Sequence, residues 1–339
     1  AKFEWLMSCG ITEDKDKLLS KIRQLTTPFG IYQFGIKNKP NPAYGYALDD
    51  QVRALIIANE FNDANLINIY TNYIIKSKRP DGLLFQFCDT RGNFVDNSSK
   101  EETQISQDAY GETIWAILKT KAQTPQLKEI FGNLIKYADY WKSLRPQSYA
   151  ILGLTSTKNQ IPIEKKIIDN LIGAFLKNTT PDWQWFEETL IYANAVIPWA
   201  LFEEAITRNN SEAKKIAQKS LDFLLKVSQT DGFPTPIGFN GWFKKGGQKA
   251  LYGQQPICAG YMVCCLEKAY IATNEQKYLD WAKKWWGWFW GNNTKKISLV
   301  DENFACFDGI NENGLNPNQG AESTICFLLA YLSAKRMGL

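Results

Sequence analysis

Apolar residues recur at helical spacing along almost the whole chain. Hydrophobic positions three and four residues apart mark one face of a helix, whereas strict alternation would mark a strand. The pattern predicts about twelve helices and no convincing series of strands. We place the helices at residues 13–25, 49–61, 63–78, 107–121, 125–142, 147–155, 163–177, 188–208, 211–228, 255–273, 275–290 and 319–336.

The lengths of the connections between these helices alternate. Short links predict antiparallel helix hairpins, and they occur at 61–63, 122–125, 208–211 and 273–275. Most hairpins are followed by long polar connections, at 26–48, 79–106, 229–254 and 291–318, whereas the joins near 143–146 and 178–187 are short. Short turns are therefore expected at one end of the bundle and long loops at the other.

The two members of each hairpin differ in polarity. The helices that begin near residues 49, 107, 147, 188, 255 and 319 are the more apolar, and we expect them inside. Their partners, such as the lysine-rich segment 211–228, have an amphipathic pattern that is typical of an outer helix. Six hairpins in an inner and an outer ring predict an all-α fold, an (α/α)6 barrel, formed as a single domain over residues 1–339.

The composition narrows the possible partners and the compartment. A dispersed net charge of +4 offers no basic block for nucleic acid. No apolar run reaches the roughly 18 residues of a membrane-spanning helix. The seven cysteines are odd in number and include the adjacent Cys264 and Cys265, which predicts free thiols in a reducing compartment. The N-terminus carries no signal-peptide pattern, so a cytoplasmic protein is expected.

The chain contains no histidine. Its absence excludes Ser-His-Asp and Cys-His nucleophiles and most zinc sites. Any chemistry must therefore use carboxylates, Tyr, Lys, Arg or Cys, and no cofactor or metal is predicted.

The predicted barrel brings the starts of six inner helices, and the loops before them, to one bowl. Carboxylates, amides and indoles gather there, as in sugar sites, where hydroxyl groups need hydrogen bonds and sugar rings stack on indoles. The predicted substrate-binding residues are Asp50, Arg53, Arg145, Trp185, Glu188, Asn194, Trp242, Gln254, Gln255, Asp308, Asn316 and Gln319. Asp49, Glu112 and Tyr149 fall at the same helix starts.

Several of these residues also have a purely structural interpretation. Asp49 and Asp50 could cap a helix, and Asp50 could pair with Arg53 one turn later. Ser106 is a natural N-cap, which would make Asp108 a partner of the helix dipole. Asn318 is likewise a candidate N-cap of the last helix, with Glu322 in its first turn.

Without histidine, the natural reaction is glycoside cleavage by two carboxylic acids. Trp185 and Phe186 would raise the pKa of the neighbouring Glu187 by desolvation, so Glu187 is the predicted acid. Asp108 or Glu322 is the predicted base.

Several segments resemble a family of bacterial proteins in the six-hairpin glycosidase-like superfamily that is often described as glycosyltransferase-associated. They are the WFEETLIYANA stretch from Trp185, the TDGFPTPIG stretch from Thr230, the GWFKKGG stretch from Gly241, the QQPICA stretch from Gln254 and the NPNQGAEST stretch from Asn316. The resemblance runs from about Tyr44 to the C-terminus. It implies an (α/α)6 barrel and carbohydrate chemistry on mannose-containing glycans.

The chain departs from that family at three polar positions. Gly253 and Cys258 stand where the family tends to have aspartate, and Glu112 stands where it tends to have arginine. A different substrate or a lost activity would follow from such changes. The N-acylglucosamine epimerases of the same fold build their acid–base pair on histidines, which this chain lacks.

The main hypothesis is a glycoside hydrolase acting on an oligosaccharide. The alternative is a non-catalytic glycan-binding protein on the same barrel, working beside a glycosyltransferase. A terpene-cyclase-like barrel would need a nearly anion-free cavity, which the predicted bowl does not offer. A phosphorylase would need a cationic phosphate pocket, for which Arg53 and Arg145 are the candidates.

Overall fold

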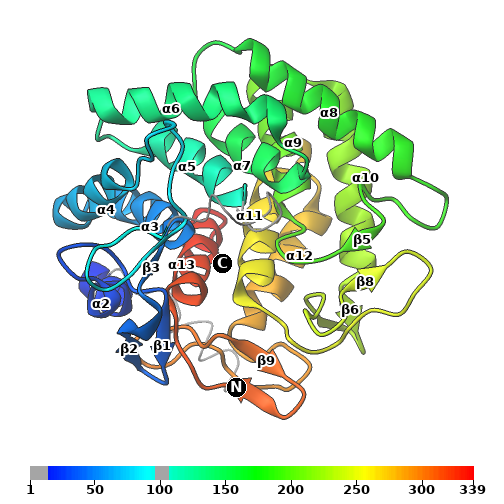
Figure 1. Ribbon diagram of the computed structural model, residues 1–339. Helices are drawn as coiled ribbons and strands as arrows, with labels where there is room; N and C mark the ends of the chain where they lie inside the picture. Colours follow the sequence, from blue (N-terminus) through cyan, green and yellow to red (C-terminus); the bar gives the residue numbers. More distant parts are fainter. Residues whose placement is uncertain (1–13, 96–106) are drawn as a thin grey trace.

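The computed structural model describes residues 14–95 and 107–339, and most of these residues are helical (Figure 1). The described part contains twelve α-helices, in agreement with the sequence prediction. They are α2 (Lys15–Leu25), α3 (Leu48–Glu60), α4 (Ala64–Lys76), α5 (Asp108–Lys119), α6 (Pro125–Tyr137), α7 (Leu144–Leu154), α8 (Pro162–Asn178), α9 (Val196–Arg208), α10 (Ser211–Val227), α11 (Pro256–Thr273), α12 (Gln276–Trp288) and α13 (Ala321–Arg336).

Six of these helices form a closed inner ring. Each packs against the next in the order α3, α5, α7, α9, α11, α13 and back to α3. Each inner helix also packs against one outer helix, in the pairs α3–α4, α5–α6, α7–α8, α9–α10, α11–α12 and α13–α2. Figure 1 shows the inner helices around the centre of the molecule. The predicted (α/α)6 barrel is confirmed.

Inner and outer helices differ in burial as their sequences predict. Helix α11 is buried from Pro256 to Glu267 without interruption. Helix α10 instead buries a stripe that includes Ala213, Ile216 and Ala217 and turns its lysines outward. Burial on all sides marks an inner position, and burial on one face marks an outer one.

In three hairpins, the short turn contains an asparagine whose backbone is in the left-handed region. Asn62, Asn209 and Asn274 have φ values of 49°, 56° and 57°. Asparagine tolerates this conformation better than most residues, and it ends a helix without glycine. In two of these turns the next residue, Asp63 or Asn210, caps the following helix through its side chain.

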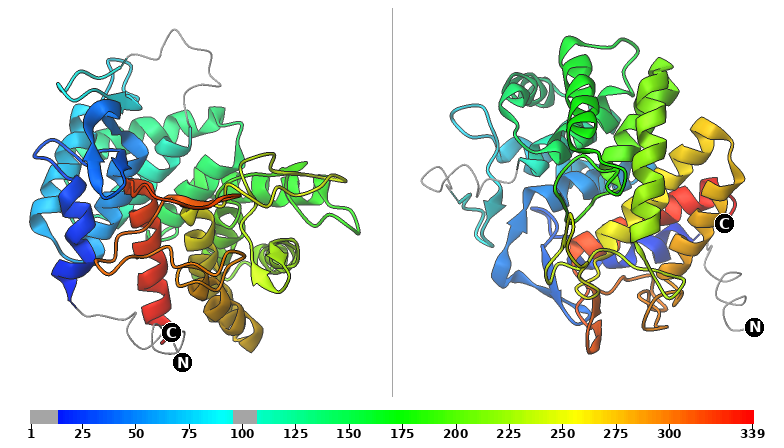
Figure 2. Two further views of the ribbon diagram at one scale, coloured as in Figure 1. Left: turned by 90° about the horizontal axis from the view of Figure 1, so that it is seen from below. Right: turned by 90° about the vertical axis from the view of Figure 1, so that its right-hand side faces the viewer.

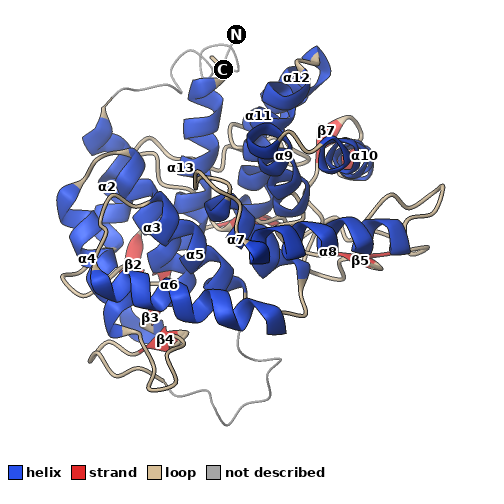
Figure 3. Ribbon diagram, turned by 90° about the horizontal axis from the view of Figure 1, so that it is seen from above, coloured by secondary structure: helices blue, strands red, loops and turns tan. Residues whose placement is uncertain are grey.

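The long connections carry short antiparallel ribbons, shown in red in Figure 3. The pairs are β1 (Phe34–Ile36) with β2 (Lys39–Asn41), β3 (Tyr46–Ala47) with β4 (Phe87–Cys88), β5 (Thr189–Leu190) with β8 (Phe243–Lys244), β6 (Gln229–Thr230) with β7 (Phe233–Pro234), and β9 (Gly309–Asn311) with β10 (Gly314–Asn316). Two of these pairs, β3–β4 and β5–β8, tie different loops together. Single turns of 3₁₀ helix lie at Pro42–Tyr44 and Ala138–Tyr140.

Three local predictions about the helix ends are corrected. The predicted helix at 188–208 begins at Val196, so the join before it is long and spans 179–195, with Ala193 at a φ of 51°. The predicted helix at 125–142 ends at Tyr137. The N-cap of α13 is Gly320, because the Asn318 side chain instead accepts a hydrogen bond from the Lys37 amide at 3.0 Å. The N-cap proposed at Ser106 lies outside the described residues.

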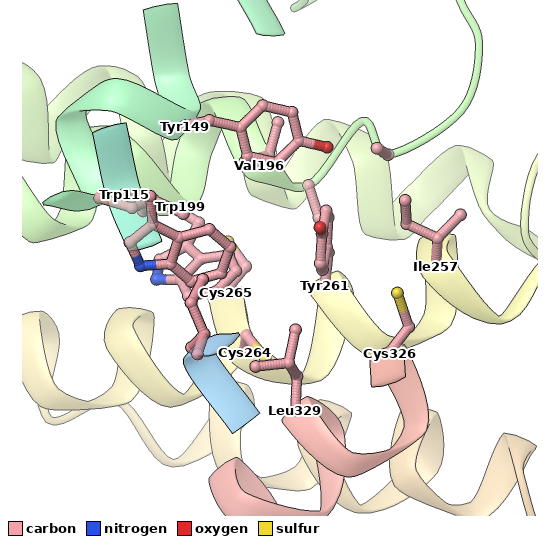
Figure 4. Packing of buried hydrophobic residues seen from close by; sticks show 14 of the residues in the cluster. Trp115, Tyr149, Val196, Trp199, Ile257, Tyr261, Cys264, Cys265, Cys326 and Leu329 are labelled. Atoms are coloured by element: carbon pink, nitrogen blue, oxygen red, sulfur yellow. The ribbon is translucent and has the colours of Figure 1, made fainter. Parts of the chain in front are cut away.

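Four aromatic side chains close the middle of the barrel (Figure 4). Trp115 and Trp199 meet edge to face with ring centroids 5.4 Å apart, and Trp199 lies 5.7 Å from Tyr261. Tyr149 completes the cluster, 5.9 Å from Tyr261 and 6.4 Å from Trp115. These residues come from α5, α7, α9 and α11, so the cluster divides the loop end of the barrel from the opposite end. Figure 2 shows α13 running between the two ends.

The six described cysteines, among them the adjacent Cys264 and Cys265, are buried and unpaired, as predicted. None of the described helices combines the length and the apolar character that crossing a bilayer requires.

Candidate active site

A cavity of about 330 Å³ lies at the loop end of the barrel. Its walls come from the first turns of inner helices and from the loops before α9 and α11. The lining residues are Asp49, Arg53, Asp108, Glu112, Tyr149, Tyr192, Phe239, Trp242, Gln255, Ile257 and Glu322. Four carboxylates and four aromatic rings therefore face one space.

Arg53 is buried beneath this cavity, with 1% of its surface exposed, and contacts four carboxylates. Its Nη2 lies 2.6 Å from Asp49 Oδ2, and its Nη1 lies 2.9 Å from Glu322 Oε2. Its Nε lies 3.5 Å from Glu112 Oε1, and Asp50 is 3.8 Å away. The helical spacing of α3 places Asp49 and Asp50 one turn before Arg53, while α5 and α13 supply the other two.

Burial raises the pKa of Asp50 and of Glu112 well above the usual carboxyl range. Nearby carboxylates such as Asp49 add to the shift, and Arg53 opposes it. Glu112 Oε2 is buried and has no hydrogen-bond partner among the described residues. With one guanidinium shared by four carboxylates, Asp50 and Glu112 hold their protons more tightly than usual.

A second network surrounds Arg145 on α7. Its Nε lies 3.6 Å from Asp108 Oδ2, and its Nη1 lies 3.6 Å from Glu187 Oε2. Its guanidinium lies over the Tyr192 ring, 4.8 Å from the centroid. The Tyr192 hydroxyl donates a hydrogen bond to Asp108 Oδ2 at 2.5 Å. Arg145 therefore links α5 to the loop that precedes α9.

Burial also raises the pKa of Asp108, while Arg145 and the hydrogen bond from Tyr192 act in the opposite direction. Burial raises the pKa of Glu187 as well, with Arg145 opposing the shift and Asp108 adding to it. Burial raises the pKa of Tyr192 too, so this hydroxyl stays protonated and acts as a donor. Both carboxyl groups in this network therefore hold a proton more tightly than an exposed carboxyl group does.

Two side chains hold the loop that carries Glu187 and Tyr192. Trp183 Nε1 donates to the backbone carbonyl of Glu187 at 2.8 Å. Asn194 Oδ1 accepts from the Ile191 amide at 3.0 Å, and Asn194 Nδ2 donates to the Ile191 carbonyl. Asn194 was predicted to bind substrate; instead, both ends of its amide bind its own loop.

The structure places some of the predicted site residues at the cavity and others near its edge. The residues that line it are Arg53, Asp108, Trp242, Gln255 and Glu322. Asp50, Arg145 and Glu187 lie outside the lining but contact the two networks through ion pairs.

Three predicted binding residues face elsewhere. Trp185 is fully buried and packs edge to face on Phe186 at 5.1 Å, so it offers no face to a sugar. Glu188 is exposed, and its Oε1 lies 3.8 Å from Lys245 Nζ. Gln254 Oε1 accepts from Trp288 Nε1 at 3.1 Å, and its Nε2 donates to the Leu251 carbonyl, which fixes the loop before α11.

Three more predicted binding residues organise the start of α13 instead. Asp308 Oδ1 accepts from the Gly320 amide and the Ser323 hydroxyl, both at 2.7 Å. Asn316 Oδ1 accepts from the Asn318 amide at 3.2 Å. Gln319 Nε2 donates to Asp301 Oδ2 at 2.8 Å and lines a separate polar cavity of about 260 Å³.

The sequence interpretation missed part of the lining. Asp49, Glu112 and Tyr149 stand at the inner-helix starts but were not selected. Glu112 could have been chosen, because it follows Asp108 by one helical turn and so shares its face. The sequence prediction does not include Tyr192, Phe239 or Ile257 in the site. No local sequence signal indicates that Phe239, which lies in a long loop, faces the cavity.

The aromatic lining gives the cavity surfaces on which a sugar ring can stack. Tyr192 and Trp242 lie with ring centroids 6.2 Å apart and come from different loops. The β5–β8 ribbon joins these loops, with Leu190 opposite Phe243. Carboxylates on the floor and rings on the wall are the lining expected for a carbohydrate.

Within residues 14–95 and 107–339, no group of three or more His, Cys, Asp and Glu side chains is arranged to hold a metal ion. At the floor of the cavity, the guanidinium of Arg53 occupies the centre of the carboxylates.

No protein-family profile and no curated protein sequence matches this chain. Solved structures with the same fold do. A cellobiose 2-epimerase from Bacillus thermoamylovorans has a TM-score of 0.72 at 10% identity, over 97% of this chain and 100% of the other. A D-mannose isomerase has a TM-score of 0.70 at 12% identity, over 95% and 96%. An inactive variant of a Salegentibacter α-1,6-mannanase in complex with α-1,6-mannotriose has a TM-score of 0.61 at 12% identity, over 95% and 98%. At these identities the likeness establishes the fold.

Proposed function

We propose that this protein is a glycoside hydrolase that acts on the end of a short oligosaccharide. The observation that carries the proposal is a pair of carboxyl groups, Asp108 and Glu322, in contrasting environments of one cavity. Such contrasts are how enzymes assign an acid and a base to two similar side chains. The three solved structures of this fold described above belong to enzymes whose names refer to sugars or a sugar polymer, which supports carbohydrate chemistry here.

Asp108 is the proposed general acid. Burial favours its protonated form, and the Tyr192 hydroxyl and Arg145 fix the position of Oδ2. Asp108 would give its proton to the glycosidic oxygen as the bond from that oxygen to the anomeric carbon breaks.

Glu322 is the proposed general base. Its side chain is 38% exposed and lies 2.9 Å from the guanidinium of Arg53, so it is accessible to water. Helices α5 and α13 flank α3 in the ring, so Asp108 and Glu322 face the cavity from either side of Arg53. Glu322 would remove a proton from the water that attacks the anomeric carbon, and solvent would return a proton to Asp108.

Glu187, the acid predicted from the sequence, becomes a positioning residue in this proposal. Its carboxyl group contacts Arg145 outside the cavity lining, and Arg145 in turn contacts Asp108. Glu187 would thus act on the proton of Asp108 through the guanidinium.

The substrate is proposed to be short because the cavity is small. Its volume lies near the lower end of the range of about 300–1,000 Å³ that is usual for small-molecule sites. Manno-oligosaccharides are the first candidates, because the mannanase of the same fold binds α-1,6-mannotriose. The buried, unpaired cysteines support the expected reducing compartment.

Two alternatives remain testable with the same cavity. A non-catalytic glycan-binding protein, working beside a glycosyltransferase, would use the same rings and carboxylates without turnover. A sugar epimerase or isomerase is the second candidate, because enzymes of those kinds have TM-scores of 0.72 and 0.70 to this chain. Without histidine, such an enzyme would use the carboxyl groups to move a proton on a reducing sugar.

The test compares the wild type with Asp108→Asn and Glu322→Gln on manno-, gluco- and galacto-oligosaccharides. Ligand binding is followed by thermal shift, and products are followed by chromatography. Cleavage by the wild type, with loss of turnover but retained binding in both variants, would support the hydrolase. A changed reducing sugar without cleavage would identify an epimerase or isomerase, and stabilisation without any product would identify a binder.

A further inference from the structure

Around the cavity, the described carboxyl groups outnumber the arginines that they contact. Six carboxyl groups face it or contact its arginines: Asp49, Asp50, Asp108, Glu112, Glu187 and Glu322. The cations that they contact are Arg53 and Arg145. Other titratable groups on the packed elements are Tyr149 on α7, Tyr192 in the loop before α9, Cys258 and Tyr261 on α11, and Cys326 on α13.

Buried carboxylates require either a cation or a proton, because an isolated charge in a poorly hydrated site is costly. Arg53 cannot satisfy four carboxylates equally: two lie within 2.9 Å of it, whereas Glu112 and Asp50 are 3.5 and 3.8 Å away. Among the described residues, Arg53 is thus the one cation that contacts the carboxylates of the cavity floor.

Glu112 is the cavity-lining residue at which a positive charge is missing. It lines the space, is 2% exposed, and directs Oε1 at Arg53. Its second oxygen, Oε2, is buried without a partner among the described residues. A hydroxyl group would give this oxygen one hydrogen bond, whereas an ammonium group would give it a hydrogen bond and a compensating charge.

The walls above this floor also favour a cation. Tyr149, Tyr192, Phe239 and Trp242 line the same space, and the faces of such rings attract positive charge. The Arg145 guanidinium already lies over one face of Tyr192.

We propose that the cavity selects an amino sugar, with the ligand's ammonium group seated against Glu112. The idea rests on the proposed function in taking this cavity as the sugar site. It adds the chemical class of the ligand, a hexose with a free amine rather than a neutral or N-acetylated one.

The test compares sugars of equal size that differ at one substituent. Glucosamine and mannosamine are titrated calorimetrically against glucose, mannose and N-acetylglucosamine. We expect the two amines to bind about tenfold more tightly or better, with the preference reduced by added salt. Equal binding of the amino and neutral sugars would overturn the proposal and leave the hydrolase proposal intact.

Glu112→Gln is the diagnostic variant, because it keeps the shape of the side chain and removes its charge. We expect it to lose the preference for amines while it still binds neutral sugars. Glu188→Gln is the matched control, since Glu188 is exposed and lies outside the cavity lining. Retention of the amine preference in Glu112→Gln would exclude the assigned contact.

A measurement on the wild type alone covers the case in which Glu112→Gln does not fold. Seating an ammonium beside carboxyl groups whose pKa values are raised favours their ionised forms, so binding of the amine should release protons. Titration in buffers of different ionisation enthalpy measures that release, and its absence would overturn the proposal. Binding of glucosamine or mannosamine, together with no cleavage of oligosaccharides built from neutral or amino sugars, would uphold this inference and reject the hydrolase.

Discussion

Arg53 Nη1 lies 2.9 Å from Glu322 Oε2 and so joins α3 to α13, the first and the last inner helices in chain order. The same guanidinium also contacts Asp49, Asp50 and Glu112. One buried side chain therefore fixes the floor of the cavity and stabilises the position at which the inner ring closes.

Replacing Arg53 with methionine should destabilise the fold strongly. The variant leaves buried carboxyl groups without their cation, which costs about 3–5 kcal/mol in the free energy of unfolding. Urea denaturation measures the change. Lys165→Met is the control: its ion pair with Asp169 is exposed on both sides and should be worth about 1 kcal/mol or less. Equal effects of the two substitutions would contradict the role given to Arg53.

The two tryptophans predicted to bind sugar should respond in opposite ways. Trp185→Ala removes a fully buried indole and should cost about 3–5 kcal/mol of stability. Trp242→Ala removes a partly exposed ring from the cavity wall, so ligand affinity should fall with a much smaller loss of stability. Thermal unfolding with and without ligand separates the two effects. An unchanged affinity in Trp242→Ala would remove this ring from the site.

The free energy of unfolding should decrease as the pH rises, over a range set by the raised pKa values of Asp50 and Glu112. Their pKa values are raised in the folded state, so the folded protein binds more protons than the unfolded chain between the two pKa values. Their contribution is complete below the ordinary carboxyl pKa of about 4 and is lost as the pH rises through the folded pKa. In Glu112→Gln the slope of the melting temperature against pH should be shallower than in the wild type. An identical slope would show that Glu112 titrates normally.

Tyr192→Phe should move the alkaline limb of the activity profile to higher pH. The hydrogen bond from Tyr192 lowers the pKa of Asp108, so its loss lets the acid keep its proton further into the alkaline range. The ring remains, so the melting temperature should change little. A shift in the opposite direction, or none, would argue against Asp108 as the proton donor.

The sequence predicts the barrel well because periodicity and short links are local signals. Segment 211–228 alternates lysines with apolar residues at helical spacing, and Asn209 ends the helix before it. The site is predicted less well, because its loops are held by contacts between distant residues. Trp183 to Glu187 is a local contact, but the pairing of Leu190 with Phe243 is not, and it places Tyr192 near Trp242. No pattern within either loop indicates that register.

Four of the misplaced residues bind the protein's own loops and helix starts. Asp308 and Asn316 accept hydrogen bonds from backbone amides near the start of α13, where such amides need acceptors. Gln254 and Gln319 donate hydrogen bonds within their own loops, to the Leu251 carbonyl and the Asp301 carboxylate. The sequence does not indicate which amide or carboxylate meets the backbone and which meets the cavity.

The sixth hairpin of the barrel pairs α13 with α2, so its two helices come from opposite ends of the described chain. During synthesis on the ribosome, the other five hairpins can form as soon as their own residues emerge. Helix α2, and the side of α3 that packs on α13, lack their partner until α13 has been made, roughly 300 residues after α2. Helix α13 thus completes the cavity floor, because its first turn brings Glu322 to Arg53.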